Sequence, residues 1–288
     1  MALRDLLVHV DQTPSALVRL RLAADLAVRH GSFLTALYVR EWSRAQLDAR
    51  KSAELGLASL QGLRDLDRQT EDAIDATADK LRGALAALRR DRGLQAELRV
   101  IDGEAAAAVP QYARYADLCV LAPDQPEGPA SVNYTFAEHL LFATGRPVLF
   151  IPDDKPPPTL GRHVVVAWNS SRPAARSVND ALPLLERAER VTVLMVNPSG
   201  FIDERIAPPG EQMVEHLRRH GATTTAAVRI DNVPPRAIAD TLQEKAADLG
   251  GDILVAGAFG HPRLWEKMLG GVTHDLIAGM RLPILMSH

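Results

Sequence analysis

The residues best suited to chemistry in this sequence form one glycine-rich segment near the C-terminal end. They follow an apolar, strand-like run with the spacing G-x2-G-x9-G-G-x-T, and they are Gly257, Gly260, Gly270, Gly271 and Thr273. Glycines after a parallel strand let a ligand approach the backbone, and a helix beginning beyond Gly270 presents free N–H groups to an anion. The segment predicts a phosphate-binding site with Thr273 as an added donor, and a purely structural glycine turn is the alternative.

Other chemistries lack their characteristic patterns. No G-x4-G-K-[ST] loop occurs, and the glycines do not follow the first strand as they do in the dinucleotide fingerprint. There is no G-x-S-x-G nucleophile elbow and no recognisable carboxylate pair for acid–base catalysis. His261 and His274 flank the segment without a cysteine or acidic ligand set at tight spacing, so we predict no metal site. We predict no catalytic residues either.

The composition indicates a soluble globular protein with enough apolar material for two ordinary cores. The chain has 288 residues, of which 47% are hydrophobic and 24% charged, and its formal net charge is -3. This balance does not favour a nucleic-acid partner, and no apolar run approaches the roughly 20 residues that cross a bilayer. The single cysteine, Cys119, lies in an apolar run, which predicts a buried core residue in a cytoplasmic protein.

Strand-like apolar runs recur in the same order in the two halves of the chain. In the first half they are residues 6–10, 34–39, 97–101, 118–122 and 148–151. In the second half they are residues 164–169, 191–196, 230–231, 252–256 and 283–286. Stretches with helical spacing separate the runs, which predicts parallel sheets with helices on their faces. The repeat divides the chain into domains 1–153 and 159–288, joined by a short proline-rich linker.

The first half contains an insertion. Equivalent second strands end 157 residues apart, at Val39 and Val196, but equivalent third strands end only 129 residues apart, at Asp102 and Asp231. The first half therefore has 28 additional residues, within about 41–93. Few β-branched residues occur there, so we predict a long helix or a helical hairpin. One of its faces carries Leu81, Leu85 and Leu88.

The first half lacks the glycine segment. In the repeat register, Gly257 corresponds to Ala122. Residues 123–129 contain prolines, which remove N–H donors, and two acidic side chains that would repel phosphate. Asp11 keeps an acidic residue after the first strand, but the phosphate cradle is missing. We therefore predict that this half is a structural or regulatory partner.

The residues that follow the first strand of each half also predict local structure. Asp11 and Asn169 occupy equivalent positions and are expected to cap turns rather than to act in catalysis. Thr13-Pro14 resembles a helix start with proline at the first helical position. Trp168, at a strand end, is expected to be a packing residue.

The glycine segment, the stretch Val166–Ser171 and the closing residues Pro283–His288 together resemble the universal stress (UspA-like) proteins. The resemblance extends over essentially the whole chain, as a tandem two-domain member. It implies, in each domain, a doubly wound five-stranded parallel sheet of order 3-2-1-4-5, as in adenine nucleotide alpha hydrolase-like folds. It also implies an intramolecular pseudo-dimer joined through the last strands, 148–151 and 284–286, with self-association of whole chains in addition.

Some members of this family bind ATP and others do not. The resemblance implies ATP, with Mg2+, as the ligand of the second half. The positions carried over are Asn169, Val196, Ala256, Gly257, Gly260, Gly270, Gly271, Val272 and Thr273. Two of them depart from the pattern of ATP-binding members, because Gly271 stands where Ser or Thr is usual and Asn169 where Asp is common. A lost hydroxyl donor to phosphate costs about 1 kcal/mol or more.

Three functions remain open at the level of sequence. The first is a stress-response module that binds an adenine nucleotide in the second half. The second is a scaffold that binds no nucleotide and interacts with protein partners, which Gly271 slightly favours. The third is a weak ATPase, against which the missing Walker lysine and general base count.

Overall fold

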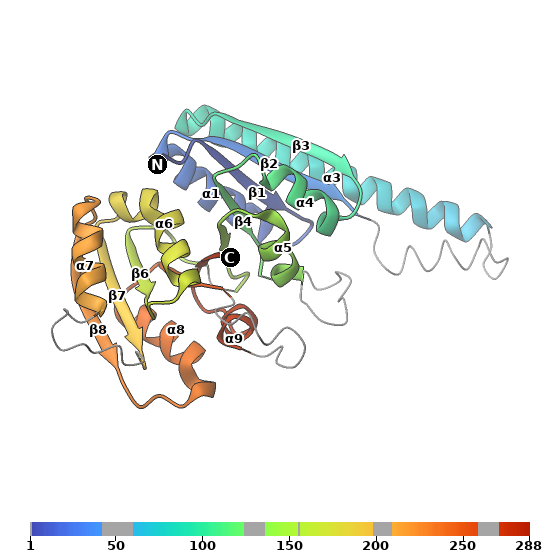
Figure 1. Ribbon diagram of the computed structural model, residues 1–288. Helices are drawn as coiled ribbons and strands as arrows, with labels where there is room; N and C mark the ends of the chain where they lie inside the picture. The colour runs from blue at the N-terminus through green and yellow to red at the C-terminus, as the bar shows by residue number, and fades with distance from the viewer. Residues whose placement is uncertain (1, 42–59, 124–135, 155, 198–208, 259–270) are drawn as a thin grey trace.

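The computed structural model of the chain describes residues 2–41, 60–123, 136–154, 156–197, 209–258 and 271–288. Gly260 and Gly270, predicted to belong to the phosphate site, lie outside the described residues. The described residues form ten strands, which alternate with helices along the chain except between the fifth and sixth strands (Figure 1). None of the described helices is both long and apolar enough to cross a membrane.

The strands form a single sheet that runs through both halves. Its order is β3-β2-β1-β4-β5-β10-β9-β6-β7-β8. The strands of the first half are β1 (Asp5–Val10), β2 (Phe33–Arg40), β3 (Ala96–Asp102), β4 (Leu118–Leu121) and β5 (Val148–Phe150). Those of the second half are β6 (His163–Ala167), β7 (Arg190–Val196), β8 (Thr224–Ile230), β9 (Ile253–Gly257) and β10 (Ile284–Ser287). Each half has the order 3-2-1-4-5, which confirms the prediction.

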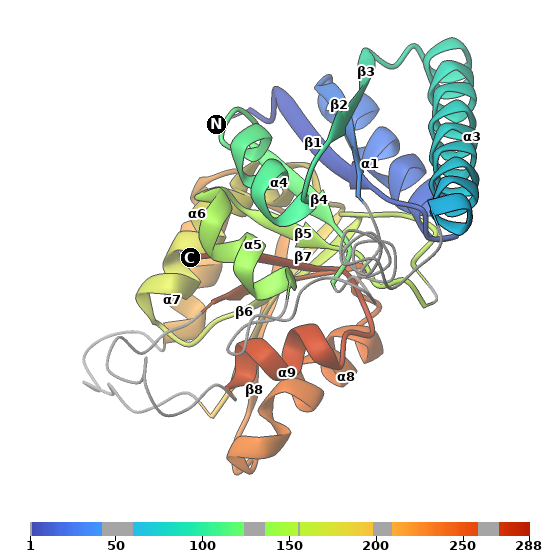
Figure 2. The same ribbon diagram turned by 90° about the vertical axis from the view of Figure 1, so that its right-hand side faces the viewer.

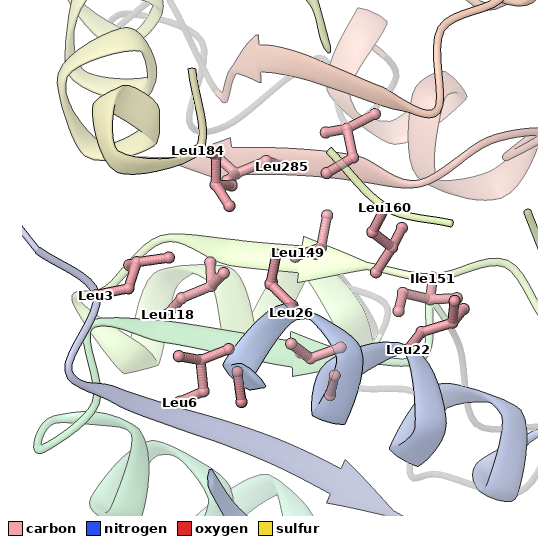
Figure 3. Close-up of a cluster of buried hydrophobic side chains, with 14 of the residues drawn as sticks. Leu3, Leu6, Leu22, Leu26, Leu118, Leu149, Ile151, Leu160, Leu184 and Leu285 are labelled. Carbon is pink, nitrogen blue, oxygen red and sulfur yellow. The ribbon is translucent and has the colours of Figure 1, made fainter. Parts of the chain in front are cut away.

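The two halves join through their last strands, as predicted. All strand pairs within a half are parallel, whereas β5 and β10 pair antiparallel, with Leu149 opposite Leu285. Side chains from both halves meet around this pair, among them Leu26, Leu160 and Leu184 (Figure 3). Because Leu149 and Leu285 are fully buried, the junction belongs to one continuous apolar core.

Helices cover both faces of the sheet. One core cluster contains residues of α1 (Ala16–His30), α3 (Leu60–Arg92), α6 (Arg172–Arg187) and α7 (Pro209–Arg219). The other contains residues of α4 (Ala105–Ala113), α5 (Phe136–Thr144), α8 (Ile238–Asp248) and α9 (Val272–Ala278), with the short turn η1 (Pro235–Ala237) before α8. Cys119 is fully buried in this second cluster, where burial raises the pKa of its thiol to about 12.

The insertion of the first half forms a long single helix, α3, in the part that the structure describes. It lies alongside α1, and its N-terminal part extends beyond the sheet (Figures 1 and 2). Leu81 and Leu85 are buried and Leu88 packs partly buried against the same core, which confirms that the three share one face. The apolar face of α3 therefore covers the sheet of the first half near β3, its outermost strand.

The predicted helix start at Thr13-Pro14 is wrong. Helix α1 begins at Ala16, and the N–H of Ala16 donates to the carbonyl of Thr13 at 3.1 Å. The carboxylate of Asp11 accepts hydrogen bonds from the backbone N–H and the hydroxyl of Thr13. These bonds hold residues 12–15 in a turn, which delays the helix by two residues.

Candidate functional site

The predicted site residues that the structure describes gather at one edge of the sheet, where strands of the second half end. Chain winding reverses between the neighbouring strands β6 and β9, which is the usual ligand position in open α/β sheets. Asn169 follows β6, Val196 ends β7, and Ala256 and Gly257 end β9. Gly271, Val272 and Thr273 begin α9, which follows β9 along the chain.

Asn169 organises the turn into α6, as predicted. Its side-chain oxygen accepts a hydrogen bond from the N–H of Ser171 at 3.1 Å, and Ser171 Oγ accepts from the N–H of Ala174 at 3.3 Å. Ser171 is thus the N-cap of α6, and Ser170 between them has a positive φ of 59°. The side chain of Asn169 remains exposed at the carboxyl end of β6, where a ligand can reach it.

Gly257 has a packing role. A Cβ atom at this position would lie 2.5 Å from the carbonyl carbon of Pro173 and 2.8 Å from Ala174 Cα, and it would also collide with Ala174 N. The first turn of α6 can therefore approach β9 only because residue 257 has no side chain. This explains Gly257 without a ligand.

Gly271 differs from Gly257. No described atom lies within 4 Å of a Cβ built on Gly271, and its φ of -124° suits any residue. Gly271 is the N-cap of α9 and makes no side-chain cap. Thr273, two residues later, is 8% exposed, so most of the predicted donor side chain is buried.

Two residues that sequence reasoning missed hold this edge together. The hydroxyl of Ser177, fully buried in α6, donates to the carbonyl of Ala256 at 2.8 Å and accepts from the N–H of Ser287 at 3.1 Å. Asn197, directly after Val196, has its side-chain oxygen 3.0 Å from the N–H of Val233. A serine on the buried face of an amphipathic helix was the available signal for Ser177.

The equivalent edge of the first half contains a buried ion pair. Arg19, 1% exposed, reaches Asp11 Oδ2 at 2.5 Å and Asp153 Oδ1 at 3.2 Å, and its Nε donates to the carbonyl of His9 at 3.0 Å. Burial alone would raise the pKa of Asp11, but Arg19 and the hydrogen bonds from Thr13 hold it below its ordinary value. Burial also lowers the pKa of His9 to about 4. The carboxylate after β1 is therefore already neutralised by a protein side chain.

No family model and no curated protein matches the sequence. Among solved structures, a universal stress protein from Archaeoglobus fulgidus DSM 4304 superposes with a TM-score of 0.68. The match covers 98% of this chain and 95% of that one, at 15% sequence identity. The chain has the universal stress protein fold. A functionally unknown protein from Pseudomonas aeruginosa PAO1 is also similar, with a TM-score of 0.60, 16% identity, and coverage of 99% of this chain and 92% of that one.

The universal stress protein fold accounts for the positions of the two edges. In each half the carboxyl ends of the first and fourth strands, β1 and β4 or β6 and β9, lie side by side. The two halves therefore offer two equivalent places for a ligand, and they differ in the side chains that occupy those places.

Proposed function

We propose that the second half binds an adenine nucleotide, ATP with Mg2+, at the carboxyl ends of β6, β7 and β9. The observation that carries the proposal is the difference between the two edges. Asn169 is exposed and neutral, whereas its counterpart Asp11 is engaged by the buried Arg19. A neutral, exposed residue at the end of β6, next to the strand β9 that ends at Gly257, accommodates phosphate without like-charge repulsion.

The first half is proposed to be structural or regulatory. Its Asp11 is held by Arg19, and Arg19 is held in turn by Asp153 and the carbonyl of His9. Residues 1–153 and 159–288 are proposed as the two domains, and the protein as cytoplasmic, which suits its single buried thiol. Self-association of whole chains and binding of protein partners also belong to the proposal.

A scaffold that binds no nucleotide is the second candidate, and Gly257 favours it. Close packing against Pro173 and Ala174 is sufficient reason for a glycine there. Under this alternative the glycine spacing reflects the fold, and the surfaces of the protein carry its function. Nucleotide binding itself distinguishes the two candidates.

The test is isothermal titration of the full chain with ATP and Mg2+, repeated on Gly271→Asp. The added carboxylate should weaken binding about tenfold or more, because a like charge beside phosphate costs on the order of 1 kcal/mol or more. Gly83→Asp is the matched control, since Gly83 lies on α3 and likewise has no described atom within 4 Å of its Cβ position.

The expected result is equal affinity for the native chain and Gly83→Asp, and an affinity about tenfold or more lower for Gly271→Asp. Absence of binding in all three proteins would overturn the proposal in favour of the scaffold. Steady release of phosphate during the titration would favour the weak ATPase that the sequence left open.

A further inference from the structure

Among the described residues, a side-chain contact between His274 and Glu138 links the start of α9 to the first half of the chain. His274 Nδ1 lies 3.2 Å from Oε1 of Glu138 on α5. The side chain of Glu138 is 3% exposed, whereas that of His274 is 39% exposed. A buried carboxylate of the first half therefore faces the first turn of α9, one residue after Thr273.

The repeat places these two residues at equivalent positions. Leu149 and Leu285, which pair at the centre of the junction, are 136 residues apart, and so are Glu138 and His274. In a symmetric dimer of identical subunits, residues related in this way would be identical and could face each other at the axis. Two glutamates there would repel, whereas this chain places an acid opposite an imidazole. The tandem chain thus contains a pairing that a symmetric dimer lacks.

The second half anchors α9 at its opposite end. Gln243, fully buried in α8, donates through Nε2 to the carbonyl of Gly279 at 3.1 Å. Its side-chain oxygen accepts from the N–H of Arg281 at 2.7 Å. Both bonds lie at the C-terminal end of α9. The N-terminal turn, which carries Gly271 and Thr273, is the part that the first half contacts.

We propose that Glu138 is a positioning residue, through which the first half sets the place of the first turn of α9 and so the nucleotide affinity of the second half. The effect on nucleotide affinity rests on the proposed function, whereas the positioning of α9 does not. The first half is regulatory in this specific sense. Its buried carboxylate orients His274, and His274 belongs to the turn that begins with Gly271.

The first measurement is hydrogen exchange of the amides of residues 272–278 in the full chain without nucleotide. Glu138→Ala should accelerate their exchange about tenfold, the equivalent of one hydrogen bond to a charged group. Glu138→Gln should stay near the native rate, because the amide oxygen still accepts a hydrogen bond from the imidazole. His274→Ala removes the half-exposed imidazole and should accelerate exchange as Glu138→Ala does.

The matched control is Phe142→Leu. Phe142 also lies on α5 and contacts the second half, where its ring centroid lies 4.6 Å from that of His288. It takes no part in the hydrogen bond between Glu138 and His274. It should leave the exchange of residues 272–278 unchanged. Acceleration in Phe142→Leu equal to that in Glu138→Ala would overturn the proposal, because general loosening of the junction would then explain both.

The second measurement is ATP affinity. Glu138→Ala should weaken binding about five- to tenfold, and Glu138→Gln should restore most of it. If the native chain binds no ATP, the proposed function fails, and exchange at residues 272–278 still decides the positioning role. Should Glu138→Ala fail to fold, His274→Ala takes its place in both measurements. Unchanged exchange in folded Glu138→Ala or His274→Ala would overturn the positioning role.

Discussion

Arg19 and Ser177 occupy the same position in the two halves, on the helix that follows the first strand. A shift of 158 residues relates them, as it relates Asp11 to Asn169. Arg19 neutralises Asp11 and reaches Asp153, whereas Ser177 links α6 to the ends of β9 and β10. The residue at this position therefore stabilises the carboxyl ends of the strands by ion pairs in the first half and by neutral hydrogen bonds in the second half.

The difference teaches how a repeated fold can lose or keep a site. A buried arginine needs acidic partners, and Arg19 has two of them, Asp11 and Asp153. A serine makes no such demand and leaves the end of the first strand free for another group.

Arg19→Met should have the largest effect, a loss of about 3–5 kcal/mol in the free energy of unfolding, because it leaves the Asp11 carboxylate buried without its cation. Urea denaturation measures the loss. Arg82→Ala, which removes an exposed ion pair with Asp79, should cost under about 1 kcal/mol. Equal losses of unfolding free energy in the two variants would show that the buried ion pairs of Arg19 do not stabilise the first half more than an exposed ion pair does.

The same pair predicts a pH dependence. The folded pKa of Asp11 is lowered, so its contribution to stability is present above the unfolded carboxyl pKa of about 4. The contribution is lost as the pH falls through the lower folded pKa. Arg19→Met should therefore lose less stability on acidification than the native chain does. An equal decline in the unfolding free energy of both proteins as the pH falls would show that protonation of Asp11 is not what destabilises the native chain in acid.

Gly257→Ala comes next, at about 1–3 kcal/mol, because its methyl group would force the first turn of α6 away from β9. Gly271→Ala should cost up to about 1 kcal/mol, because its methyl group meets no described atom within 4 Å but alanine caps a helix less well than glycine. Thermal unfolding compares the two. A negligible effect of Gly257→Ala on thermal stability would show that packing does not require this glycine, and ligand binding would be the remaining reason for it.

Ser177→Ala should cost about 1–2 kcal/mol, because the N–H of Ser287 and the carbonyl of Ala256 each lose a buried partner. Asn179→Ala on the same helix removes an exposed hydrogen bond to the carbonyl of Ala175 and should cost under about 0.5 kcal/mol. Denaturant midpoints separate the two. If Ser177→Ala loses no more unfolding free energy than Asn179→Ala, the hydrogen bonds of Ser177 do not stabilise the ends of β9 and β10.

Much of the fold follows from patterns that can be counted along the chain. Buried parallel strands appear as short apolar runs, and five of them in the same order twice predict parallel sheets in both halves. The face of α3 that carries Leu81 follows from helical periodicity in the same way. The junction at Leu149 and Leu285 is implied by the resemblance to universal stress proteins.

Individual polar partners could not be predicted in this way. The partners of Arg19 lie 8 and 134 residues away, and Glu138 meets His274 across 136 residues. Such pairs depend on which helix faces which strand end, and local spacing does not encode that. The packing role of Gly257 is hidden for the same reason, since Pro173 and Ala174 approach it only in the folded chain.

Gly271→Ser is the smallest change and tests the second edge most directly. Serine caps a helix better than glycine by only a few tenths of a kcal/mol, so the melting temperature should rise slightly. The same hydroxyl restores the residue type usual in ATP-binding universal stress proteins, and a hydrogen bond of about 1 kcal/mol to phosphate should tighten ATP binding about fivefold. Calorimetry of unfolding and of ATP binding measures the two effects on one protein. A higher melting temperature with unchanged affinity would mean that residue 271 caps α9 without reaching a nucleotide, and the second edge would then differ from the first in packing alone.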